Sequence, residues 1–554
     1  MSPSESKELR MRIRMSDSFT ITSRSIAKNF IQSILFVDDK VHNPDQGDHP
    51  FDVKLVIEQS VTRGLIAAAF APKHHDDIST IVEVGRKADV IVLDWRMDFP
   101  DNTDQGLDDD EAEDVADSRG DFAVNAIKNL IIKTECGETV DQLKLIFIYT
   151  GETGLQAISS RLNTEFADFT KLDEFTFSCG GIRISIWAKE ILSSSFRHIP
   201  ENKKRLRTYT QLLDEMPIEY ATVSSGLLSN TCLAALASLR NNTYKLLARF
   251  TPSLDPAFVA HRAMLHCPDD AGELLKETIC GELNSILTDE DIAKQVSSTI
   301  IDEWMSSRNF IDNKIKVKKG NDTTPPTTIT IDNARRKLWQ RNGYIALLTR
   351  EQNTEREPLL NVKEINKCER DELKKHAVAS FTPQNFNSDN FNEEFSILTH
   401  HKRNYLSTAN SPSLSLGVMV KENDRYLLCI QQRCDSVRIP DGEKRKFLFL
   451  PMKKNNQNFD VLFNNGGRGY VKLSTCYKEC HALEIIEFVA LERSGIVQAQ
   501  KEEGVFNFTG GSDNQIKYQW ILDLKEAHAQ RIANNFAAQL ARVGIDESEW
   551  LRRT

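Results

Sequence analysis

Residues 34–41 read ILFVDDKV, an apolar run that leads directly into two adjacent carboxylates, Asp38 and Asp39. The apolar run is typical of a buried strand, and the carboxylates mark its end. Adjacent carboxylates repel each other and lose hydration when they leave water, so a strand that ends in two of them needs an explanation. One explanation is an acidic surface loop, and the other is a site that binds a cation.

Four further apolar runs follow before residue 190. They are GLIAAAFA (64–71), ADVIVLDW (88–95), LKLIFIYTG (143–151) and IRISIW (182–187). Each run is nearly continuous in hydrophobicity, as expected for parallel strands that are covered on both faces. Helices are predicted around 51–62, 76–87, 120–133 and 153–171. The alternation predicts a doubly wound α/β domain at 23–197 with a five-stranded parallel sheet, whose ligand sites lie at the carboxyl ends of the strands.

The rest of the chain divides by composition into further regions. At 554 residues it is too long for one core, and about 150 residues per domain predicts three or four units. The strand signal disappears over 198–312, which we predict to be helical; Leu228, Cys232 and Leu236 mark one face of a helix there. We predict four further regions along the chain. They are a flexible N-terminus (1–22), a solvated acidic insertion (99–118), a Pro- and Gly-containing linker (313–330) and a β-rich α+β domain with a terminal helix (331–554).

Charge and cysteine content exclude several classes of protein. The formal net charge of −10 argues against non-specific nucleic-acid binding as the main activity. No apolar run approaches the roughly 20 residues that span a bilayer, and the N-terminus lacks the apolar region of a secretory signal. The ten cysteines are scattered, which fits reduced thiols. We therefore expect a cytoplasmic, multidomain protein without a membrane partner.

The strand ends of the first domain bring chemically active residues together. The first predicted strand ends in the Asp38–Asp39 pair, the third in Asp94 and the fourth in Thr150, and Lys189 follows the fifth. These ends lie along one edge of a doubly wound sheet. Three carboxylates favour a hard cation such as Mg²⁺, which prefers oxygen ligands. A hydroxyl and an ammonium group beside them suit phosphoryl oxygens, and an aspartate can itself accept a phosphoryl group.

This set of residues resembles the receiver domain of two-component response regulators. The matching positions are Asp38, Asp39, Asp94 in VLDWRM, Thr150 in IYTG and Lys189 in IWAK. The resemblance implies that Asp39, Asp94 and the backbone carbonyl of Arg96 ligate Mg²⁺, with Asp38 acting through bound water. It also implies that Asp94 accepts the phosphoryl group.

Thr150 and Lys189 complete the catalytic set that the resemblance implies. Both would contact the phosphoryl oxygens, and the hydroxyl of Thr150 would reorient when Asp94 is phosphorylated. One departure concerns Lys189, because Glu190 follows it where the family usually has a proline. The alternative is a pseudo-receiver that keeps the fold and serves as a phosphorylation-independent scaffold or adaptor.

A second resemblance concerns residues 226–265. This segment is similar to the helical extension of a large receiver-like family in bacterial conflict systems, often found beside histidine-kinase-like ATPases. The resemblance implies a GHKL-type ATPase partner and a signalling role in anti-phage defence. Two alternatives remain open further along the chain. One is an effector enzyme with an active site in 331–554, and the other is a zinc site built from Cys429, Cys434, Cys476 and Cys480 with His481.

Overall fold

The computed structural model describes residues 18–41, 51–97, 120–132, 142–190, 203–265, 268, 270–317, 327–344, 347, 349–352, 355–358, 367–384, 386, 390–402, 411–456, 459–465, 469–475, 483–490, 495–511 and 515–540. The chain divides into two compact units, Met1–Arg370 and Asp371–Thr554. The predicted acidic insertion at 99–118 lies outside the described residues. The N-terminus was predicted to be flexible as far as residue 22, but helix α2 (Ser18–Phe30) begins before that point.

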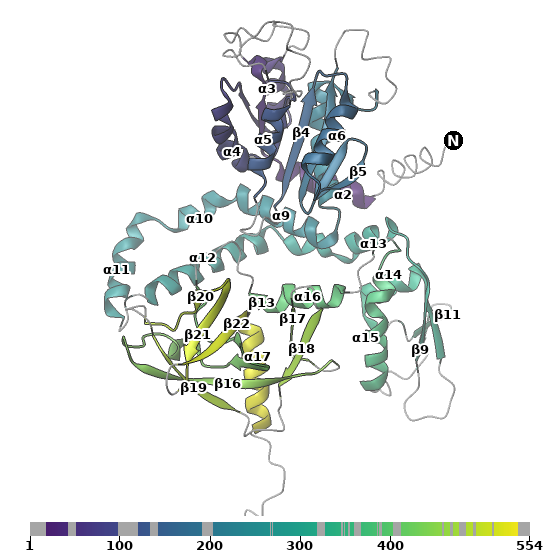
Figure 1. Cartoon of the computed structure of the whole chain (residues 1–554). Coiled ribbons are helices and arrows are strands. Elements are labelled where there is room, and N and C mark those ends of the chain that lie inside the picture. Colours follow the sequence, from purple (N-terminus) through teal and green to yellow (C-terminus); the bar gives the residue numbers. More distant parts are fainter. Residues whose placement is uncertain are drawn as a thin grey trace, which may run out of the picture. The chain divides into compact units, whose positions relative to one another are not determined.

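The predicted parallel sheet forms the centre of the first unit (Figure 1). Its strands are β1 (Ser33–Val37), β2 (Ile66–Phe70), β3 (Val90–Leu93), β4 (Lys144–Thr150) and β7 (Ile182–Lys189). They pair in the order β2-β1-β3-β4-β7, and every pair is parallel. This is one of the two common doubly wound orders, so the predicted fold class is confirmed.

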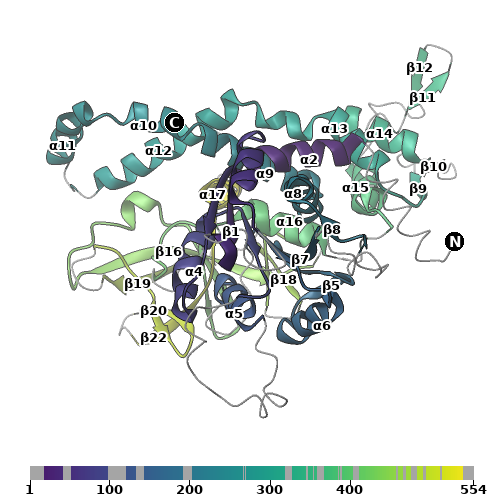
Figure 2. The ribbon, with the colours of Figure 1, turned by 90° about the horizontal axis from the view of Figure 1, so that it is seen from above.

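Helices cover both faces of this sheet, which explains why its strands are apolar at nearly every position. On β1, Leu35 and Val37 pack with α4 (Ile78–Lys87), α5 (Asp121–Leu130) and α6 (Leu155–Glu165), while Ile34 and Phe36 pack with α2, α3 (Val53–Val61), α8 (Tyr209–Val223) and α9 (Leu227–Asn241). Figure 2 shows the first group on one side of the sheet and α2, α8 and α9 on the other. Two layers of helices therefore bury alternate residues of β1, β3, β4 and β7, whereas β2 at the edge of the sheet has no buried residue.

The sheet is larger than the sequence indicated. The helix predicted to reach residue 171 ends at Glu165, and β5 (Thr170–Asp173) and β6 (Thr176–Cys179) then form an antiparallel hairpin beside β7. A further short strand, β8 (Leu206–Arg207), pairs in parallel with the end of β7. Eight strands therefore form the sheet, where five were predicted.

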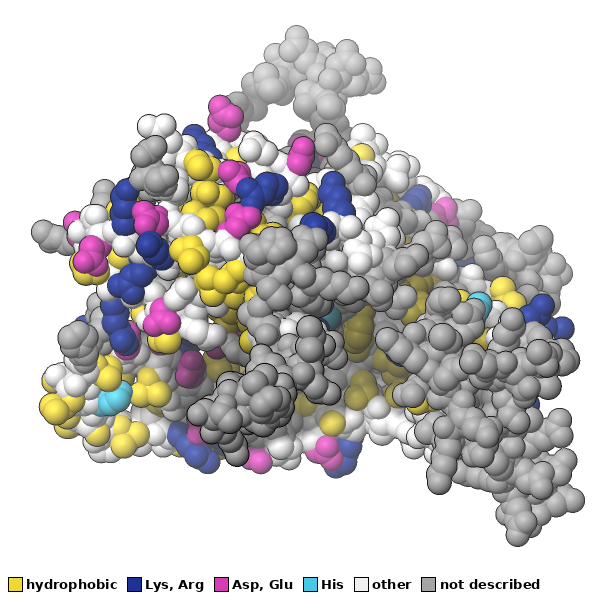
Figure 3. Space-filling view, turned by 90° about the horizontal axis from the view of Figure 1, so that it is seen from below, with side chains coloured by type: hydrophobic (Ala, Val, Ile, Leu, Met, Phe, Trp, Pro, Cys, Tyr) yellow, Lys and Arg dark blue, Asp and Glu magenta, His cyan; other side chains and the backbone are white. Residues whose placement is uncertain are grey.

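The predicted helical region contains α8, α9, α10 (Thr243–Arg249), α11 (Asp255–Met264), α12 (Asp270–Asp289) and α13 (Ser298–Ser306). In α9 the buried residues are Asn230, Leu233 and Ala237, whereas Leu228 and Leu236 of the apolar face are exposed. Apolar side chains are also exposed on α10–α12, and Figure 3 shows them gathered at lower left, over the far end of these helices. Helices α10–α12 therefore present several large apolar side chains on their surface.

The predicted linker at 313–330 instead contains regular structure at both ends. Strand β9 (Asn313–Val317) pairs antiparallel with β10 (Thr327–Ile331), and helix α14 (Asn333–Asn342) follows. Ile315, Ile329 and Trp339 are buried in this small module. A second hairpin, β11 (Thr349–Gln352) and β12 (Glu355–Pro358), precedes α15 (Lys367–Phe381). The alternating threonines and isoleucine of TTITI were the strand signal that a linker prediction overlooked.

The second unit contains a closed antiparallel barrel. Strands β14 (Val418–Glu422), β15 (Arg425–Cys429), β16 (Lys444–Lys454), β19 (Glu484–Val489), β21 (Val505–Gly510) and β22 (Ile516–Leu524) pair in that order, and β22 pairs back with β14. Alternate residues of all six strands share one core, which includes Phe447, Phe449, Phe488 and Phe508. Closure of the ring leaves these strands without free edges.

Other elements of the second unit surround the barrel. Helix α16 (Phe391–His400) leads into the short strand β13 (His401–Lys402), β17 (Val461–Asn464) and β18 (Tyr470–Thr475) extend from β16, and β20 (Gln500–Glu502) pairs with β21. The terminal helix α17 (Glu526–Leu540) packs Ala529, Ile532 and Phe536 against a second apolar cluster. The prediction of a β-rich domain with a terminal helix is confirmed. Among the described residues, no helix combines the length and hydropathy that a membrane span requires.

A buried ion pair fastens α9 to the parallel sheet. The Asp89 carboxylate, before β3, accepts hydrogen bonds from both terminal nitrogens of Arg240 (2.8 and 3.0 Å). It also accepts from the backbone of Gln32 (2.8 Å) and from the backbone and hydroxyl of Ser33 (3.0 and 3.1 Å). Because Asp89 is only 8% exposed, removing it leaves several partly buried donors without their acceptor.

We expect Asp89→Ala to lower the free energy of unfolding by about 2–4 kcal/mol, measured by urea denaturation. Asp214→Ala is the matched control, because Asp214 also receives a two-point contact from an arginine, Arg63, but its side chain is 61% exposed. Exposed pairs of that kind contribute roughly 0–1 kcal/mol. Equal losses of unfolding free energy in the two variants would show that the Asp89 contact stabilises the fold no more than an exposed ion pair does.

Candidate metal centre

Three carboxylates meet at the carboxyl ends of β1 and β3. The backbone N–H of Asp38 donates to the carbonyl of Phe70 (3.1 Å), and that of Asp94 donates to the carbonyl of Val37 (2.9 Å). The ladder thus continues one residue past each strand and fixes the direction of both side chains. Asp39 begins the 3-10 helix η1 (Asp39–Val41) directly afterwards. One oxygen from each of Asp38, Asp39 and Asp94 lies within 4.8 Å of the others.

Lys189 reaches this cluster from the end of β7. Its Nζ lies 2.6 Å from Oδ2 of Asp38 and 2.5 Å from Oδ2 of Asp94. All three side chains are almost completely buried, with Lys189 only 4% exposed. The convergence of Asp38, Asp39, Asp94 and Lys189 that the sequence predicted is therefore present in the structure.

A short strand after the fifth parallel strand holds Lys189 in place. The backbone N–H of Glu190 donates to the carbonyl of Arg207 (3.2 Å), and that of Ala188 donates to the carbonyl of Arg205 (3.0 Å). The hydroxyl of Tyr149 donates to the same Arg207 carbonyl (2.7 Å). A proline at position 190 has no N–H to make the first of these bonds. Glu190 has the N–H that a proline lacks, and its hydrogen bond to β8 helps to position Lys189.

Thr150 and Arg96 lie at the same edge of the sheet. Thr150 is fully buried at the end of β4, and its hydroxyl accepts a hydrogen bond from the backbone N–H of Glu152 (3.1 Å). The side chain of Arg96, two residues after Asp94, is half exposed and lies 4.0 Å from the carboxylate of Glu152. The loops after β3 and β4 are thus joined beside the carboxylates.

Close packing also supports the residue that follows Asp94. Trp95 is 4% exposed, and Arg161 of α6 lies over its ring, 5.7 Å from the centroid. Gly120 has φ +90° at the start of α5, and a Cβ there would lie 2.3 Å from the Trp95 ring. A glycine at position 120 therefore allows the tryptophan to close over the core next to Asp94.

Burial and mutual repulsion set the protonation of the site. Burial is the main reason that the pKa of Asp94 is raised to about 6; the charge of Lys189 partly offsets this effect of burial, and the carboxylate of Asp38 adds a smaller increase. Burial alone lowers the pKa of Lys189, but the carboxylates of Asp94 and Asp38 outweigh it and hold that pKa above its ordinary value. At neutral pH Lys189 is thus an ammonium group, and most of the Asp94 carboxyl group is ionised.

Two tyrosines complete the surroundings of Lys189, and sequence reasoning missed both. Lys189 Nζ lies 5.9 Å from the ring centroid of Tyr149, and the Tyr149 ring packs edge-on against Tyr209 at 5.3 Å. Burial raises the pKa of both phenols, so each stays a neutral hydroxyl. Tyr149 was detectable, since it directly precedes Thr150 on a predicted buried strand. Tyr209 was not, because its position depends on β8, a strand of two residues.

The proposed zinc ligands fall into two groups. Cys476, Cys480 and His481 lie outside the described residues. Cys429 is buried in β15, where burial raises the pKa of its thiol to about 12, and Cys434 is exposed. A buried neutral thiol is typical of a core residue rather than of a metal ligand. Within the described residues, the only group of side chains arranged for a metal ion is the aspartate cluster.

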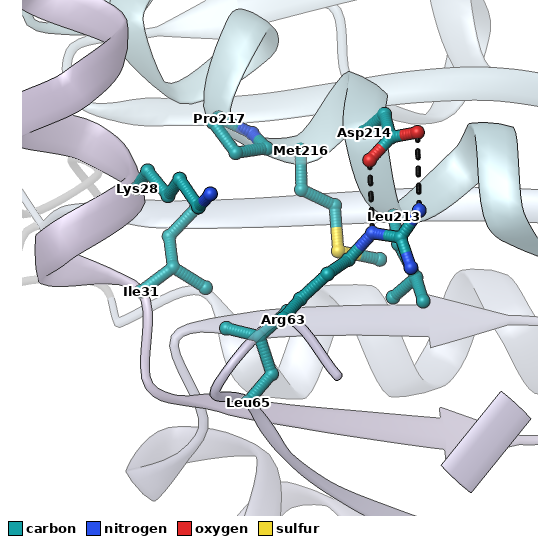
Figure 4. Close-up of a pocket in the computed structure, with 8 residues that line it drawn as sticks. All are labelled: Lys28, Ile31, Arg63, Leu65, Leu213, Asp214, Met216 and Pro217. Atoms are coloured by element: carbon teal, nitrogen blue, oxygen red, sulfur yellow. Dashed lines mark hydrogen bonds and ion pairs between the residues drawn. The ribbon is translucent and has the colours of Figure 1, made fainter. Parts of the chain in front are cut away.

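A small cavity of about 160 Å³ lies at the opposite edge of the sheet (Figure 4). Ile31 lies two residues before β1 and Leu65 one residue before β2, so the cavity is near the amino ends of these strands. Its other walls come from α2 and α8, and Arg63 contacts Asp214 across it at 2.9 Å. The cavity is therefore separate from the carboxylate cluster.

Comparison with known proteins gives one match. The family model of the response receiver domain matches residues 30–194, the range that contains the carboxylate cluster, Thr150 and Lys189. No curated protein and no solved structure matches the chain. A receiver domain indicates response-regulator-like signalling of the two-component type, in which the domain interacts with a kinase or another protein partner.

Proposed function

We propose that the receiver domain at residues 30–194 is a Mg²⁺-dependent phosphoacceptor, with Asp94 as the residue that accepts the phosphoryl group. The observation that carries this proposal is the convergence of three carboxylates and one ammonium group at the carboxyl edge of the parallel sheet. Within this group of four side chains, the carboxylates outnumber the ammonium group by two, which gives the group an excess of negative charge. A divalent cation of hard character matches both that charge and the oxygen donors.

Asp38, Asp39, Asp94 and the carbonyl of Arg96 are the groups that would hold the ion. When bound, Mg²⁺ would neutralise the charge that builds up between the acceptor carboxylate and the phosphoryl oxygens. An oxygen of Asp94 forms the bond to phosphorus while the bond between phosphorus and the donor's leaving group breaks, and the leaving group keeps the electron pair. The product is an aspartyl phosphate.

Lys189 and Thr150 would respond to that new group. In the unphosphorylated structure Lys189 bridges Asp38 and Asp94. We propose that its ammonium group turns to the phosphoryl oxygens and that the hydroxyl of Thr150 donates to one of them. The hydroxyl now accepts from Glu152, so this change would move the loop after β4. Such a movement is a means of changing a partner surface.

The biological setting is the finer part of the proposal. We propose that a histidine-kinase-like ATPase of GHKL type supplies the phosphoryl group or reads its presence, and that the pair acts in bacterial anti-phage defence. The support is the resemblance of residues 226–265 to an extension in conflict-system proteins. The described barrel unit supplies no cluster of metal-binding side chains that would favour an effector enzyme.

A second candidate function rests on one contact. Because Lys189 already neutralises part of the carboxylate charge, the cluster can persist as a structural ion network without a metal. The domain would then be a pseudo-receiver, a docking module that is never phosphorylated.

Phosphoryl uptake from acetyl phosphate separates the two candidates. We expect the full chain to gain a phosphorylated form in a phosphate-affinity gel when Mg²⁺ is present, and to gain none in EDTA. Asp94→Asn should abolish it, whereas Asp173→Asn, an exposed carboxylate of the same domain, should leave it unchanged. Uptake that is equal with and without Mg²⁺ would reject the proposed chemistry, and absence of uptake would favour the pseudo-receiver.

A further inference from the structure

The helices α10, α11 and α12 form an arm in which very little is buried. In α10, α11 and α12, Ala271 and Ile286 are the only described residues that are buried. Helices of 7 and 10 residues, the lengths of α10 and α11, do not hold their structure alone in water, and most helical stability in proteins comes from packing an apolar face. The arm therefore needs a surface that covers it.

Many exposed side chains of the arm are large and apolar, which favours a protein as the partner that covers them. Seven large apolar residues are between 36% and 86% exposed: Tyr244, Leu247, Leu254, Val259, Met264, Leu274 and Leu275. They come from all three helices and the turn between α10 and α11, and Figure 3 shows such side chains together at the far end of the arm. Exposed apolar side chains that gather in this way mark an interaction site.

The charges of the arm point to its partner. The outgoing half, residues 243–264, has Lys245, Arg249 and Arg262 against Asp255, a net charge of +2. The returning half, α12, has five acidic residues against Lys276, a net charge of −4. Ion pairs already join the halves within one chain, between Arg249 and Glu282 (3.3 Å) and between Lys245 and Glu290 (3.7 Å). The two halves are thus electrostatically complementary.

We propose that the arm binds the arm of a second copy of this chain. Under a two-fold axis, the basic outgoing half of each copy faces the acidic returning half of the other, and the apolar residues fill the space between them. Such an interface is self-complementary, as two-fold dimers require. Helices of 7, 10 and 20 residues also provide the roughly 20–30 residues per side that a stable interface uses. The acidic α12 disfavours nucleic acid or an anionic membrane as the partner.

The test is the mass of the full chain in solution, measured by light scattering over a micromolar concentration series. We expect twice the chain mass of 62.9 kDa for the wild-type protein. Leu247→Glu with Met264→Glu, at side chains 72% and 86% exposed, should weaken dimerisation at least 10-fold. The matched control is Ile485→Glu, a 62% exposed apolar residue of β19, which should leave the dimer intact.

A second variant tests the charges without touching the apolar residues. Glu277→Lys, on exposed α12, should weaken the dimer as well, and circular dichroism should show that both arm variants remain folded. A monomeric wild-type protein overturns the proposal, and so does a dimer that both arm variants leave unchanged. A monomer would show that another partner, or another part of the same chain, covers the arm.

Discussion

Replacing Lys189 by methionine is expected to lower the free energy of unfolding of the metal-free protein by about 3–5 kcal/mol at pH 8, the usual cost of leaving a buried charge without its partner. The ammonium group lies 2.5–2.6 Å from the oxygens of two buried carboxylates. Without it, Asp38 and Asp94 keep their mutual repulsion and lose their only close cation among the described residues. Methionine preserves most of the side-chain volume, so the loss would be electrostatic.

The pH dependence of this loss follows from Asp94. Its pKa is raised from 3.8 to about 6, mainly by burial, so the stability associated with Asp94 is complete below pH 3.8 and is lost as the pH rises through about 6. Removing Lys189 removes a charge that lowers this pKa, so the pKa of Asp94 rises further. The variant should therefore lose much less stability at pH 5 than at pH 8, where folding must bury the Asp94 carboxylate in its ionised form or protonate it.

Urea denaturation at the two pH values in EDTA measures this effect. Lys128→Met is the matched control, because Lys128 pairs with Glu165 at 2.6 Å but its side chain is 45% exposed. We expect no pH-dependent loss in the control. Millimolar Mg²⁺ should restore part of the stability of Lys189→Met, since a cation in the cluster replaces the missing charge. A loss that is the same at both pH values would mean that Lys189 does not stabilise ionised carboxylates.

The second large effect concerns the metal itself. We expect Asp39→Asn to weaken Mg²⁺ binding by roughly 100-fold or more, because even residues that only orient metal ligands contribute 10–100-fold. Asp38→Asn should weaken it less, since Asp38 already accepts a hydrogen bond from the backbone of Lys40 (2.9 Å) and pairs with Lys189. Asp39 is not fully buried and begins the 3-10 helix η1 after β1, which suits a direct ligand.

Titration calorimetry with MgCl₂ gives the affinities, and the fluorescence of Trp95 next to Asp94 provides an independent signal. Asp76→Asn is a suitable control, because it removes an exposed carboxylate from another strand-end loop of the same sheet. Wild-type affinity in Asp39→Asn would exclude this residue as a ligand. Equal losses in Asp38→Asn and Asp39→Asn would show that the two aspartates do not have separate roles.

Much of the receiver domain was predictable because its signals are local. The inner parallel strands are covered on both faces, so runs such as ADVIVLDW stand out as continuous hydrophobicity. Carboxyl ends of parallel strands meet at one edge, so Asp38, Asp94, Thr150 and Lys189 were expected to converge. What joins them, namely β8 and the hydrogen bonds to the Arg207 carbonyl, could not be predicted, because a strand of two residues has no hydrophobic period.

The other errors have similar physical causes. The hairpin of β5 and β6 follows α6 after only a short turn, and its exposed residues, such as those of TKLD, have no apolar alternation. The apolar face of α9 containing Leu228 and Leu236 was readable as helical, but periodicity does not say whether a face is covered by the same chain. The closure of the barrel depends on pairing between β22 and β14, which are far apart in sequence.

The most direct test of the central claim is to locate the phosphoryl group chemically. The full chain is incubated with acetyl phosphate and Mg²⁺, reduced with borohydride, which converts an aspartyl phosphate to homoserine, and mapped by peptide mass spectrometry. The account predicts homoserine at position 94, none in EDTA and none in Asp94→Asn. Homoserine at another aspartate, or none in the wild-type protein under conditions where Mg²⁺ binds, would contradict it.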